Sequence, residues 1–278
     1  MTESPLLALC KIMFNFKFPF LQKKEEKHFT LVISWGGMRA FYGLGILKAL
    51  EELGYKDKID ALYGVSAWAL LVSYRSAGYS ADEILTRFLK SDFLNFSKNL
   101  NLTPKSSLLK NTLLKKQMEK ELPKNFKDLN IPTFIGCTEV KKGENLILSS
   151  GELTSALLGT IAIPWIFPAI ERNDHLLIDG GVTDNFPIEV AKKSFPQNKI
   201  IGISLNKYRS NPKIKNLFDN LIVSFEIMLR KDIQEKGNLS NIFFCRGLDT
   251  PVLEFRTTKL KKLFELWYKD GKEKLKKL

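Results

Sequence analysis

Apolar residues along this chain gather in short continuous runs that are separated by amphipathic stretches. Short runs rich in β-branched side chains are typical of strands buried on both faces of a parallel sheet, and the stretches between them predict helices. The turn Lys-Lys-Gly-Glu separates the runs at 131–140 and 145–149. The predicted strands lie at 28–34 (HFTLVIS), 59–63, 131–140, 145–149, 175–179 and 199–205 (KIIGISL).

Helices are predicted where apolar residues recur at spacings of three and four. The first follows the strand at 28–34, with Phe41, Leu44 and Leu47 on one face, and ends near Gly54. Another begins at Ser80-Ala-Asp-Glu, where a serine followed three residues later by a glutamate is typical of a capped helix start. Further helices are predicted after Ser66 and at 108–122, 153–161, 187–193 and 214–229.

Two apolar stripes near the C-terminus are the most regular. The stripe from Ile214 to Leu229 is typical of a helix that packs on the core rather than of a cofactor-binding segment. The last 20 residues predict a basic amphipathic helix that docks on its own domain or contacts a membrane. Its apolar face consists of Leu260, Leu263, Phe264 and Trp267.

With 278 residues, 44% of them hydrophobic, the chain can bury one large α/β core. We expect one domain over residues 28–278, preceded by an N-terminal extension over 1–27. The apolar segment 5–21 is interrupted by two lysines and a proline, so it is too short to span a bilayer. It predicts contact with a membrane surface or an apolar groove, or else an unordered tail. Residues 91–130 are polar and rich in lysine, and predict either a lid that faces the substrate or a surface excursion.

The net charge of +13 favours anionic partners, either a membrane surface or nucleic acid. The lysines are spread over the helices and form no nucleic-acid-binding motif, so we favour an anionic membrane surface and expect no nucleic acid. Three widely spaced cysteines and two histidines predict neither a disulfide framework nor a metal site. We therefore expect a cytoplasmic protein without metal or cofactor, and leave open peripheral association with the inner membrane face.

A candidate nucleophile lies where the strand at 59–63 gives way to an apolar helix. The turn is Gly64-Val65-Ser66-Ala67, and a serine at a strand-to-helix turn is typical of a nucleophile elbow. Glycine flanks such a serine because strand and helix pass very close to each other. Here Gly64 fits this requirement, whereas Trp68 stands at the second glycine position.

A second strand-to-helix turn, Trp35-Gly36-Gly37-Met38, offers backbone N–H groups to an anion. A dinucleotide site would need the spacing G-x-G-x-x-G and an acidic residue after the next strand, and neither is present. An oxyanion hole needs only a few N–H donors near a nucleophile. Because Ser66 follows within 30 residues, the oxyanion hole is the favoured interpretation.

The base that would activate Ser66 is predicted to be Asp179, the last residue of its strand and the first of Asp179-Gly180-Gly181. Ligand sites of open α/β sheets lie at the carboxyl ends of their strands. His28 precedes the first strand, and His175 begins the strand that ends at Asp179, so neither suits a Ser-His-Asp triad. We therefore expect a Ser66–Asp179 dyad.

Taken in order, these motifs resemble those of the bacterial patatin-like phospholipases. That family has G-G-G-x-R-G after the first strand, G-x-S-x-G after the second, and D-G-G or D-G-A late in the domain. The corresponding stretches are W-G-G-M-R-A at 35–40, G-V-S-A-W at 64–68 and D-G-G at 179–181. The flanking sequences ILKALEELG, SAGYSADEI and LIDGGVTDNFPIEVA agree as well.

The resemblance implies a three-layer α/β/α sandwich with a mostly parallel sheet and a serine–aspartate lipid acyl hydrolase. It implies that Ser66 is the nucleophile, that Asp179 is the base, and that the substrate is a phospholipid or lysophospholipid. It also implies an oxyanion hole formed by the N–H groups of Gly36, Gly37 and Met38, with Arg39 supporting that loop.

The chain departs from the family at its tryptophans. Trp35, Trp68 and Trp165 replace family glycines, Trp267 lies where glycine is common, and Ala40 replaces a further glycine. These are all four tryptophans of the chain. We hypothesise that one codon, read as tryptophan in this translation, is read as glycine by the organism, with UGA the obvious candidate.

If the tryptophans are genuine, their size is expected to be unfavourable for catalytic activity. An indole beside the elbow is expected to push the helix off the strand or to fill the acyl pocket, and a conformation reserved for glycine would be strained. That form of the chain predicts a catalytically inactive homologue that still binds lipid or membrane. It is the alternative to an active hydrolase.

Overall fold

The computed structural model describes residues 28–91, 96–101, 107–207, 214–228, 233–247 and 257–276. The N-terminal extension 1–27 lies outside these residues, so its contact with a membrane surface stays a prediction. The strands are β1 (Phe29–Ile33), β2 (Ile59–Val65), β3 (Thr133–Glu139), β4 (Glu144–Leu148), β5 (Ile170–Arg172), β6 (His175–Asp179), β7 (Lys199–Lys207) and β8 (Ile242–Gly247).

The helices lie between these strands much as predicted. The capping box at Ser80 is formed: its side chain accepts from the Glu83 N–H, and the Glu83 carboxylate accepts from the Ser80 N–H. The α-helices are α2 (Ala40–Glu52), α3 (Ala67–Ser76), α4 (Ala81–Leu89), α5 (Phe96–Asn99), α6 (Thr112–Glu121), α7 (Leu153–Thr160), α8 (Ile188–Ser194), α9 (Leu217–Met228), α10 (Ile233–Gly237) and α11 (Thr257–Leu275). Two single-turn helices, η1 (Gly37–Arg39) and η5 (Gly180–Val182), follow β1 and β6.

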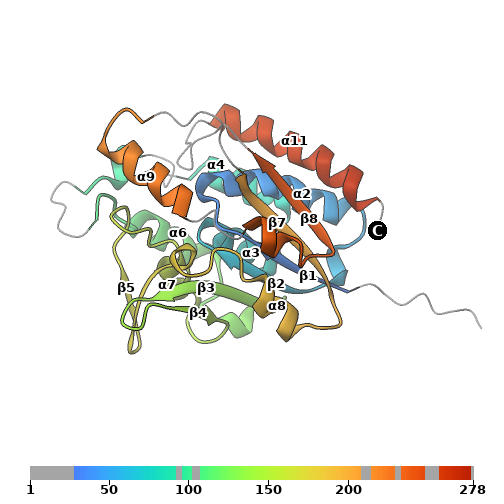
Figure 1. Ribbon diagram of the computed structural model, residues 1–278, viewed down its shortest axis with the longest axis horizontal. Coiled ribbons are helices and arrows are strands. Elements are labelled where there is room, and N and C mark those ends of the chain that lie inside the picture. Colours follow the sequence, from blue (N-terminus) through green and yellow to red (C-terminus); the bar gives the residue numbers. More distant parts are fainter. Residues whose placement is uncertain are drawn as a thin grey trace, which may run out of the picture.

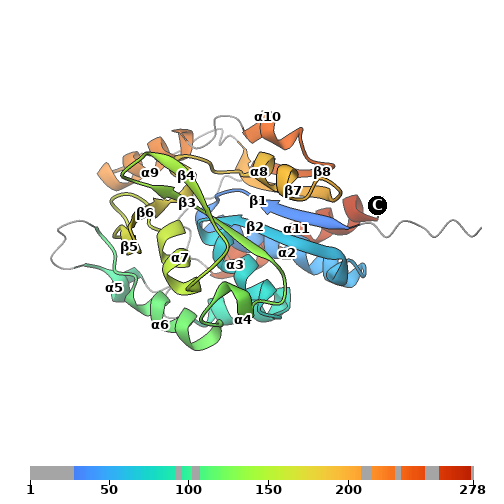
Figure 2. The same cartoon turned by 90° about the horizontal axis from the view of Figure 1, so that it is seen from below.

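The sheet is mostly parallel and has helices on both faces, which confirms the predicted fold class. Strands β3, β2, β1, β7 and β8 are parallel neighbours in that order. Helices α2, α3 and α11 cover one face, and α8 and α10 cover the other (Figures 1 and 2). The larger core fills the α2/α3 side, and a smaller cluster of Val32, Ala61, Tyr63, Phe186 and Ile188 packs on the α8 side.

One edge of β3 is shared by two strands that approach from opposite directions. Gly136 pairs with Val65 of parallel β2, and the next residue, Cys137, pairs with Asp179 of antiparallel β6. Strand β4 pairs with both Gly136 and Cys137, so it occupies the other edge of β3. Strands β2 and β6 therefore lie end to end along one edge, with their carboxyl ends facing each other.

This arrangement corrects one step of the sequence interpretation. We expected Asp179 at the carboxyl end of a strand running with the rest of the sheet, but β6 runs antiparallel to β3. The carboxyl end of β3 extends past its pairing with β2, and β6 pairs with that extension and runs back toward β2. Asp179 consequently reaches Ser66 from beyond the sheet rim.

The predicted C-terminal helix is docked on the domain. Helix α11 lies along α2 (Figure 1), and its apolar residues Leu260, Phe264 and Trp267 are buried. Gly45 allows the two helices to approach closely. A Cβ at this position would lie only 2.4 Å from the Phe264 carbonyl oxygen. The pair is also joined by Lys272 Nζ, 2.8 Å from a Glu52 carboxylate oxygen.

Only part of the apolar face of α9 packs on the core. The prediction that the stripe from Ile214 to Leu229 packs on the core was therefore partly wrong. The inner residues Ile222 and Phe225 are buried, as expected. In contrast, three apolar side chains of the stripe are exposed: Ile214 by 54%, Leu217 by 76% and Met228 by 70%. The periodicity identified the helix but not how much of its apolar surface is covered. Phe218 and Leu229 of the stripe have side chains outside the described part of the structure.

The described part of the 91–130 segment lies over the site loops. Residues Leu108 and Leu109 donate backbone hydrogen bonds to the carbonyls of Trp165 and Ile166, and Leu109 is buried against that loop. Helix α6 begins at Thr112, four residues later than the start predicted at 108. The role of this segment as a lid stays a prediction.

Candidate active site

Ser66 occupies the strained turn expected of a nucleophile elbow. Its backbone angles are φ 59° and ψ −135°, a conformation that residues with a β-carbon rarely adopt outside functional sites. Strand and helix pass closely on either side of it. A Cβ at Gly64 would lie 2.8 Å from both the N and Cα atoms of Ala69, so position 64 has no room for a side chain.

Trp68 does not displace the helix from the strand, contrary to the expectation from its size. Its indole is fully buried and turns toward α2, where Gly43 provides the space; a Cβ at Gly43 would lie 2.0 Å from the ring. The contact of Gly64 with Ala69 shows that β2 and α3 remain packed together. Among the described residues, however, the buried indole N–H has no hydrogen-bond acceptor.

Thr160 fixes the Ser66 turn through two hydrogen bonds, a role that was not predicted from the sequence. Its hydroxyl accepts a hydrogen bond from the Ser66 backbone N–H at 2.8 Å and donates one to the Gly136 carbonyl at 2.5 Å. Thr160 is the last residue of α7 and is fully buried. No motif marks it; its position three residues before the Ile-Pro of 163–164 is the only sequence signal.

Asp179 is oriented by two hydrogen bonds to its carboxylate. Oδ2 accepts from Ser66 Oγ at 2.6 Å, and Oδ1 accepts from the Gly181 backbone N–H at 2.8 Å. The Asp179 carbonyl accepts from the Thr138 hydroxyl at 2.9 Å. The two predicted dyad residues are therefore brought together, and each carboxylate oxygen has a defined donor.

The glycine after Asp179 is required by the end-to-end meeting of β6 and β2. A Cβ at Gly180 would lie 2.2 Å from the Gly136 carbonyl oxygen and 3.0 Å from the Cys137 nitrogen. The chain therefore leaves β6 in direct contact with the backbone of β3. Gly181 contributes its N–H to the Asp179 carboxylate, so the two glycines of the motif have different tasks.

The Asp179 side chain is fully buried, and burial raises its pKa from 3.8 to about 7. The hydrogen bonds from Ser66 and from the Gly181 N–H, together with Trp35, favour the charged form and limit the rise. A general base is most effective when its pKa lies near the working pH. The environment of Asp179 therefore suits proton transfer to and from Ser66 near neutrality.

The predicted oxyanion loop lies on the same side of the sheet. Gly37 has φ +54°, a conformation that favours glycine, and its N–H group, like that of Gly36, meets no acceptor among the described residues. Met38 lies in the same turn, η1, and the Arg39 N–H donates to the Gly36 carbonyl at 3.2 Å. Free N–H groups in a tight turn can stabilise an oxyanion.

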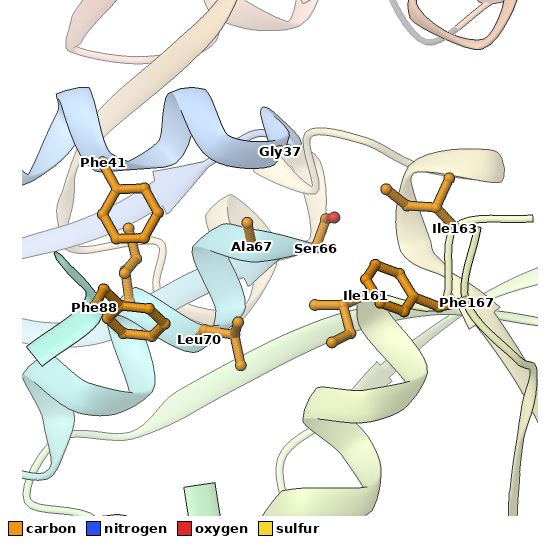
Figure 3. A pocket seen from close by; sticks show the side chains of 10 residues that line it. Gly37, Phe41, Ser66, Ala67, Leu70, Phe88, Ile161, Ile163 and Phe167 are labelled. Carbon is orange, nitrogen blue, oxygen red and sulfur yellow. The ribbon is translucent and has the colours of Figure 1, made fainter. Parts of the chain in front are cut away.

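Gly37 and Ser66 line one pocket whose other walls are apolar (Figure 3). Phe41, Leu70 and Phe88 lie on one side of Ser66, and Ile161, Ile163 and Phe167 lie on the other. The cavity is about 40 Å³, small beside the roughly 300–1,000 Å³ typical of sites for drug-sized ligands. Ser66 itself is only 1% exposed, so a substrate must widen this pocket to reach it.

The two histidines of the chain lie away from the dyad, as predicted. His28 bonds to Asp60 at the amino ends of β1 and β2, with Nδ1 and Oδ1 2.8 Å apart. His175 begins β6, paired with Arg172 of β5. Among the described residues there is also no cluster of three or more His, Cys, Asp or Glu side chains that could hold a metal ion.

Two other tryptophans occupy contrasting environments. Trp35 is buried beside the oxyanion glycines, packs edge-to-face on Phe225 with centroids 5.7 Å apart, and interacts with Asp179. Trp165 is 53% exposed and has φ +67°, in the left-handed region that bulky side chains rarely adopt. The backbone at position 165 thus has the geometry of a glycine site.

Comparisons with known proteins include a match to the part of the chain that contains this site. A family model described as Patatin-like phospholipase matches residues 31–192, which include the loop, the elbow and Asp179. Probable lipid hydrolase 463L of Invertebrate iridescent virus 6 is 28% identical over 206 residues, covering 66% of this chain and 70% of the viral protein. Patatin-like phospholipase domain-containing protein 6 of Homo sapiens is 26% identical over 183 residues, covering 63% of this chain but only 13% of the human protein.

Among solved structures, the crystal structure of VipD from Legionella pneumophila matches with a TM-score of 0.58 at 13% sequence identity. The match covers 89% of this chain and 66% of VipD, so it supports the fold.

Proposed function

Because the chain belongs to the patatin-like phospholipase family, we propose that it hydrolyses acyl esters of a glycerophospholipid or lysophospholipid. The observation that carries this proposal is the 2.6 Å hydrogen bond from Ser66 Oγ to Asp179 Oδ2 beside an apolar pocket. The name of the viral relative, a probable lipid hydrolase, supports the same class of reaction.

The proposed reaction uses Asp179 twice. As a carboxylate it accepts the Ser66 proton while Oγ bonds to the ester carbonyl carbon, and the N–H groups of Gly36, Gly37 and Met38 stabilise the developing oxyanion. Collapse of this intermediate breaks the bond to the alcohol, which takes the proton from Asp179. Water then attacks the acyl-serine ester and gives a proton to Asp179. The bond between Ser66 Oγ and the acyl carbon breaks, the fatty acid leaves, and Oγ takes the proton back from Asp179.

The pocket supports an acyl chain as the group that binds next to Ser66. Its walls are the apolar side chains of α2, α3, α4 and the loop at 161–167, and an acyl chain offers matching surface. Trp68 packs in the same core cluster as the lining residues Phe41, Leu70 and Phe88. Glycine at position 68 would free space behind these residues and allow longer chains to bind.

A membrane surface is the proposed source of the substrate. Helix α9 exposes Leu217, Ile227 and Met228, while its inner residue Phe225 packs in one cluster with Ile163 and Phe167 of the pocket wall. The net charge of +13 favours an anionic lipid surface. In the described part of the chain, no helix is both long enough and apolar enough to cross a bilayer.

A second candidate function is a lipid-binding homologue without activity. The observation that favours it is the size of the pocket, about 40 Å³ with all four tryptophans in place. Against it, the hydrogen bond between Ser66 and Asp179 is present although Trp35 flanks the oxyanion turn and Trp68 flanks the Ser66 turn. The positive φ of Trp165 supports our hypothesis that the organism places glycine at positions 35, 68, 165 and 267.

Ester hydrolysis by three purified proteins separates the two candidates. They are the chain as printed, a variant with glycine at positions 35, 68, 165 and 267, and that variant with Ser66→Ala. We expect the glycine variant to release fatty acid from phospholipid vesicles and the Ser66→Ala form to lose this activity by about 10³-fold or more. Equal hydrolysis with and without Ser66 would reject the nucleophile.

Hydrolysis by neither of the first two proteins, with vesicle binding retained by both, would support the inactive lipid-binding homologue. The codons at the four tryptophan positions provide an independent check. The glycine hypothesis requires the same reassigned codon at all four positions, and an ordinary tryptophan codon at any of them would reject it.

A further inference from the structure

Arg39, which ends the oxyanion turn η1, is part of a fully buried ion pair. Its Nη2 lies 3.0 Å from Oε1 of Glu226 on α9, and each side chain is only 1% exposed. Among the ion pairs between described residues, no other has both side chains so deeply buried. The pair joins two segments that are 187 residues apart in the sequence.

Helix α9 faces the oxyanion turn and the pocket wall together. Phe225, the neighbour of Glu226, packs on Trp35 directly before the oxyanion glycines. Ile222, one turn earlier, belongs to the same cluster, which also contains Ile163 and Phe167 of the pocket. A change in the position of α9 would therefore act on the donors of the oxyanion hole and on the acyl site.

A buried ion pair is a poor way to gain stability, because desolvation of the two charges offsets their attraction and apolar pairs often stabilise a fold as well. Its advantage is a defined geometry. The oxyanion turn needs such a restraint because Gly36 and Gly37 have no side chains to hold them and glycine is conformationally permissive. Arg39 supplies it next to the turn, through an N–H bonded to the Gly36 carbonyl.

We propose that Glu226 is a positioning residue for the oxyanion hole. By fixing the guanidinium of Arg39, it holds the N–H groups of Gly36 and Gly37 in the orientation that meets the oxyanion beside Ser66. Glu226 touches neither substrate nor the dyad, and its effect passes through Arg39. This inference rests on the proposed hydrolase function.

The test compares two ion pairs that lie at opposite ends of α2. Glu226→Gln keeps the shape of the side chain but removes the negative charge that lies 3.0 Å from Arg39. Its matched control is Glu51→Gln, because Glu51 pairs with the 3% exposed Arg75 at 3.4 Å between α2 and α3, near the opposite end of α2 from Arg39. We expect Glu226→Gln to lower kcat by about 10- to 100-fold with KM within about twofold. We expect Glu51→Gln to keep kcat within about twofold while lowering the thermal midpoint.

A double variant, Arg39→Met with Glu226→Met, separates positioning from the cost of a buried charge that has lost this partner. We expect its thermal midpoint to lie above that of Glu226→Gln because both charges of this pair are removed together, while kcat stays low if the pair orients the turn. Recovery of both midpoint and kcat, or an unchanged kcat in Glu226→Gln, would overturn the inference while the hydrolase function stands.

Amide hydrogen exchange provides a readout that does not depend on activity. At residues 36–39 we expect exchange to accelerate in Glu226→Gln and to stay at the parent rate in Glu51→Gln. If the parent protein hydrolyses no ester, the proposed function fails, and exchange alone decides the positioning role. Unchanged exchange at 36–39 in Glu226→Gln would then reject it.

Discussion

The turn that carries Ser66 follows a strand parallel to β3, whereas Asp179 ends a strand antiparallel to β3 on the same edge. The Ser66 turn is held by backbone: φ is 59°, Gly64 allows close packing, and the N–H is bonded to Thr160. The Asp179 turn is held by its side chain, through Ser66 and the Gly181 N–H. Two strands that meet end to end can therefore place a candidate nucleophile and its base in direct contact without a histidine between them. Here Ser66 Oγ and Asp179 Oδ2 are 2.6 Å apart.

Substitution of the base should have the largest effect on this pair of turns. Asp179→Asn removes the proton acceptor while keeping the shape of the side chain, so we expect kcat/KM to fall by about 10³- to 10⁴-fold. Fatty acid release from vesicles measures this directly, with thermal unfolding as the check on folding. Retention of more than a tenth of the activity would exclude Asp179 as the base.

The same variant should be more stable than its parent above neutral pH. The folded-state pKa of Asp179 is raised to about 7, so its contribution to stability is fully present below the unfolded pKa of 3.8 and is lost as pH rises through 7. An asparagine does not titrate, so the stability of Asp179→Asn has no such dependence on pH at this position. We therefore expect the gain from Asp179→Asn to grow between about pH 4 and 7, to the order of a few kcal/mol. Chemical denaturation at pH 4 and pH 8 measures it, and an equal gain at both pH values would contradict it.

Gly180→Ala tests whether the end-to-end meeting of β6 and β2 requires a glycine. The added Cβ would lie 2.2 Å from the Gly136 carbonyl oxygen, so β6 must shift from β3 and Asp179 from Ser66. We expect a loss of about 3 kcal/mol in unfolding free energy together with the loss of most activity. Gly143→Ala is the control: its φ is +69°, but no atom lies within 4 Å of the added Cβ. It should cost about 1 kcal/mol and leave kcat unchanged.

Thr160→Val should disturb the Ser66 turn without affecting the Asp179 turn. The substitution keeps the size of the side chain but removes the acceptor of the Ser66 N–H and the donor to the Gly136 carbonyl. Leaving a buried N–H without an acceptor costs about 1–3 kcal/mol, so we expect roughly a tenfold lower kcat. Burial still raises the pKa of Asp179, so the pH midpoint of kcat/KM should not move. A shifted midpoint with normal kcat would assign Thr160 to the Asp179 side instead.

Most of the fold and the identity of the dyad could be predicted from sequence because they depend on local patterns. Continuous apolar runs identified β1, β2 and β7, and the turns at Ser66 and Asp179 have recognisable glycines. The direction of β6 could not be predicted, because a five-residue strand with only three apolar residues, Leu176 to Ile178, is compatible with either pairing. Thr160 and the Arg39–Glu226 pair depend on tertiary contacts between residues 94 and 187 positions apart, which leave no local signal.

The smallest expected effect concerns the loop beside the pocket. Trp165→Gly replaces an exposed side chain whose φ is +67°, so release of backbone strain should raise stability by about 1 kcal/mol. Asn173→Gly is a suitable control because Asn173 also has a positive φ, 53°, but asparagine tolerates this region and should gain less. Thermal unfolding of both variants decides the point. A loss of stability in Trp165→Gly would indicate that the indole itself is required.

The pairing of Ser66 with Asp179 is tested most directly by the pH dependence of covalent labelling with a fluorophosphonate, measured on the four-glycine variant and read by mass spectrometry of the labelled peptide. The label should lie on Ser66, and its rate should rise about tenfold per pH unit up to the pKa of Asp179, which burial raises well above the usual value of an aspartate. In Asp179→Asn this dependence should disappear and the rate should stay low at every pH. Labelling of another residue, or an unchanged pH midpoint in Asp179→Asn, would show that Asp179 does not activate Ser66.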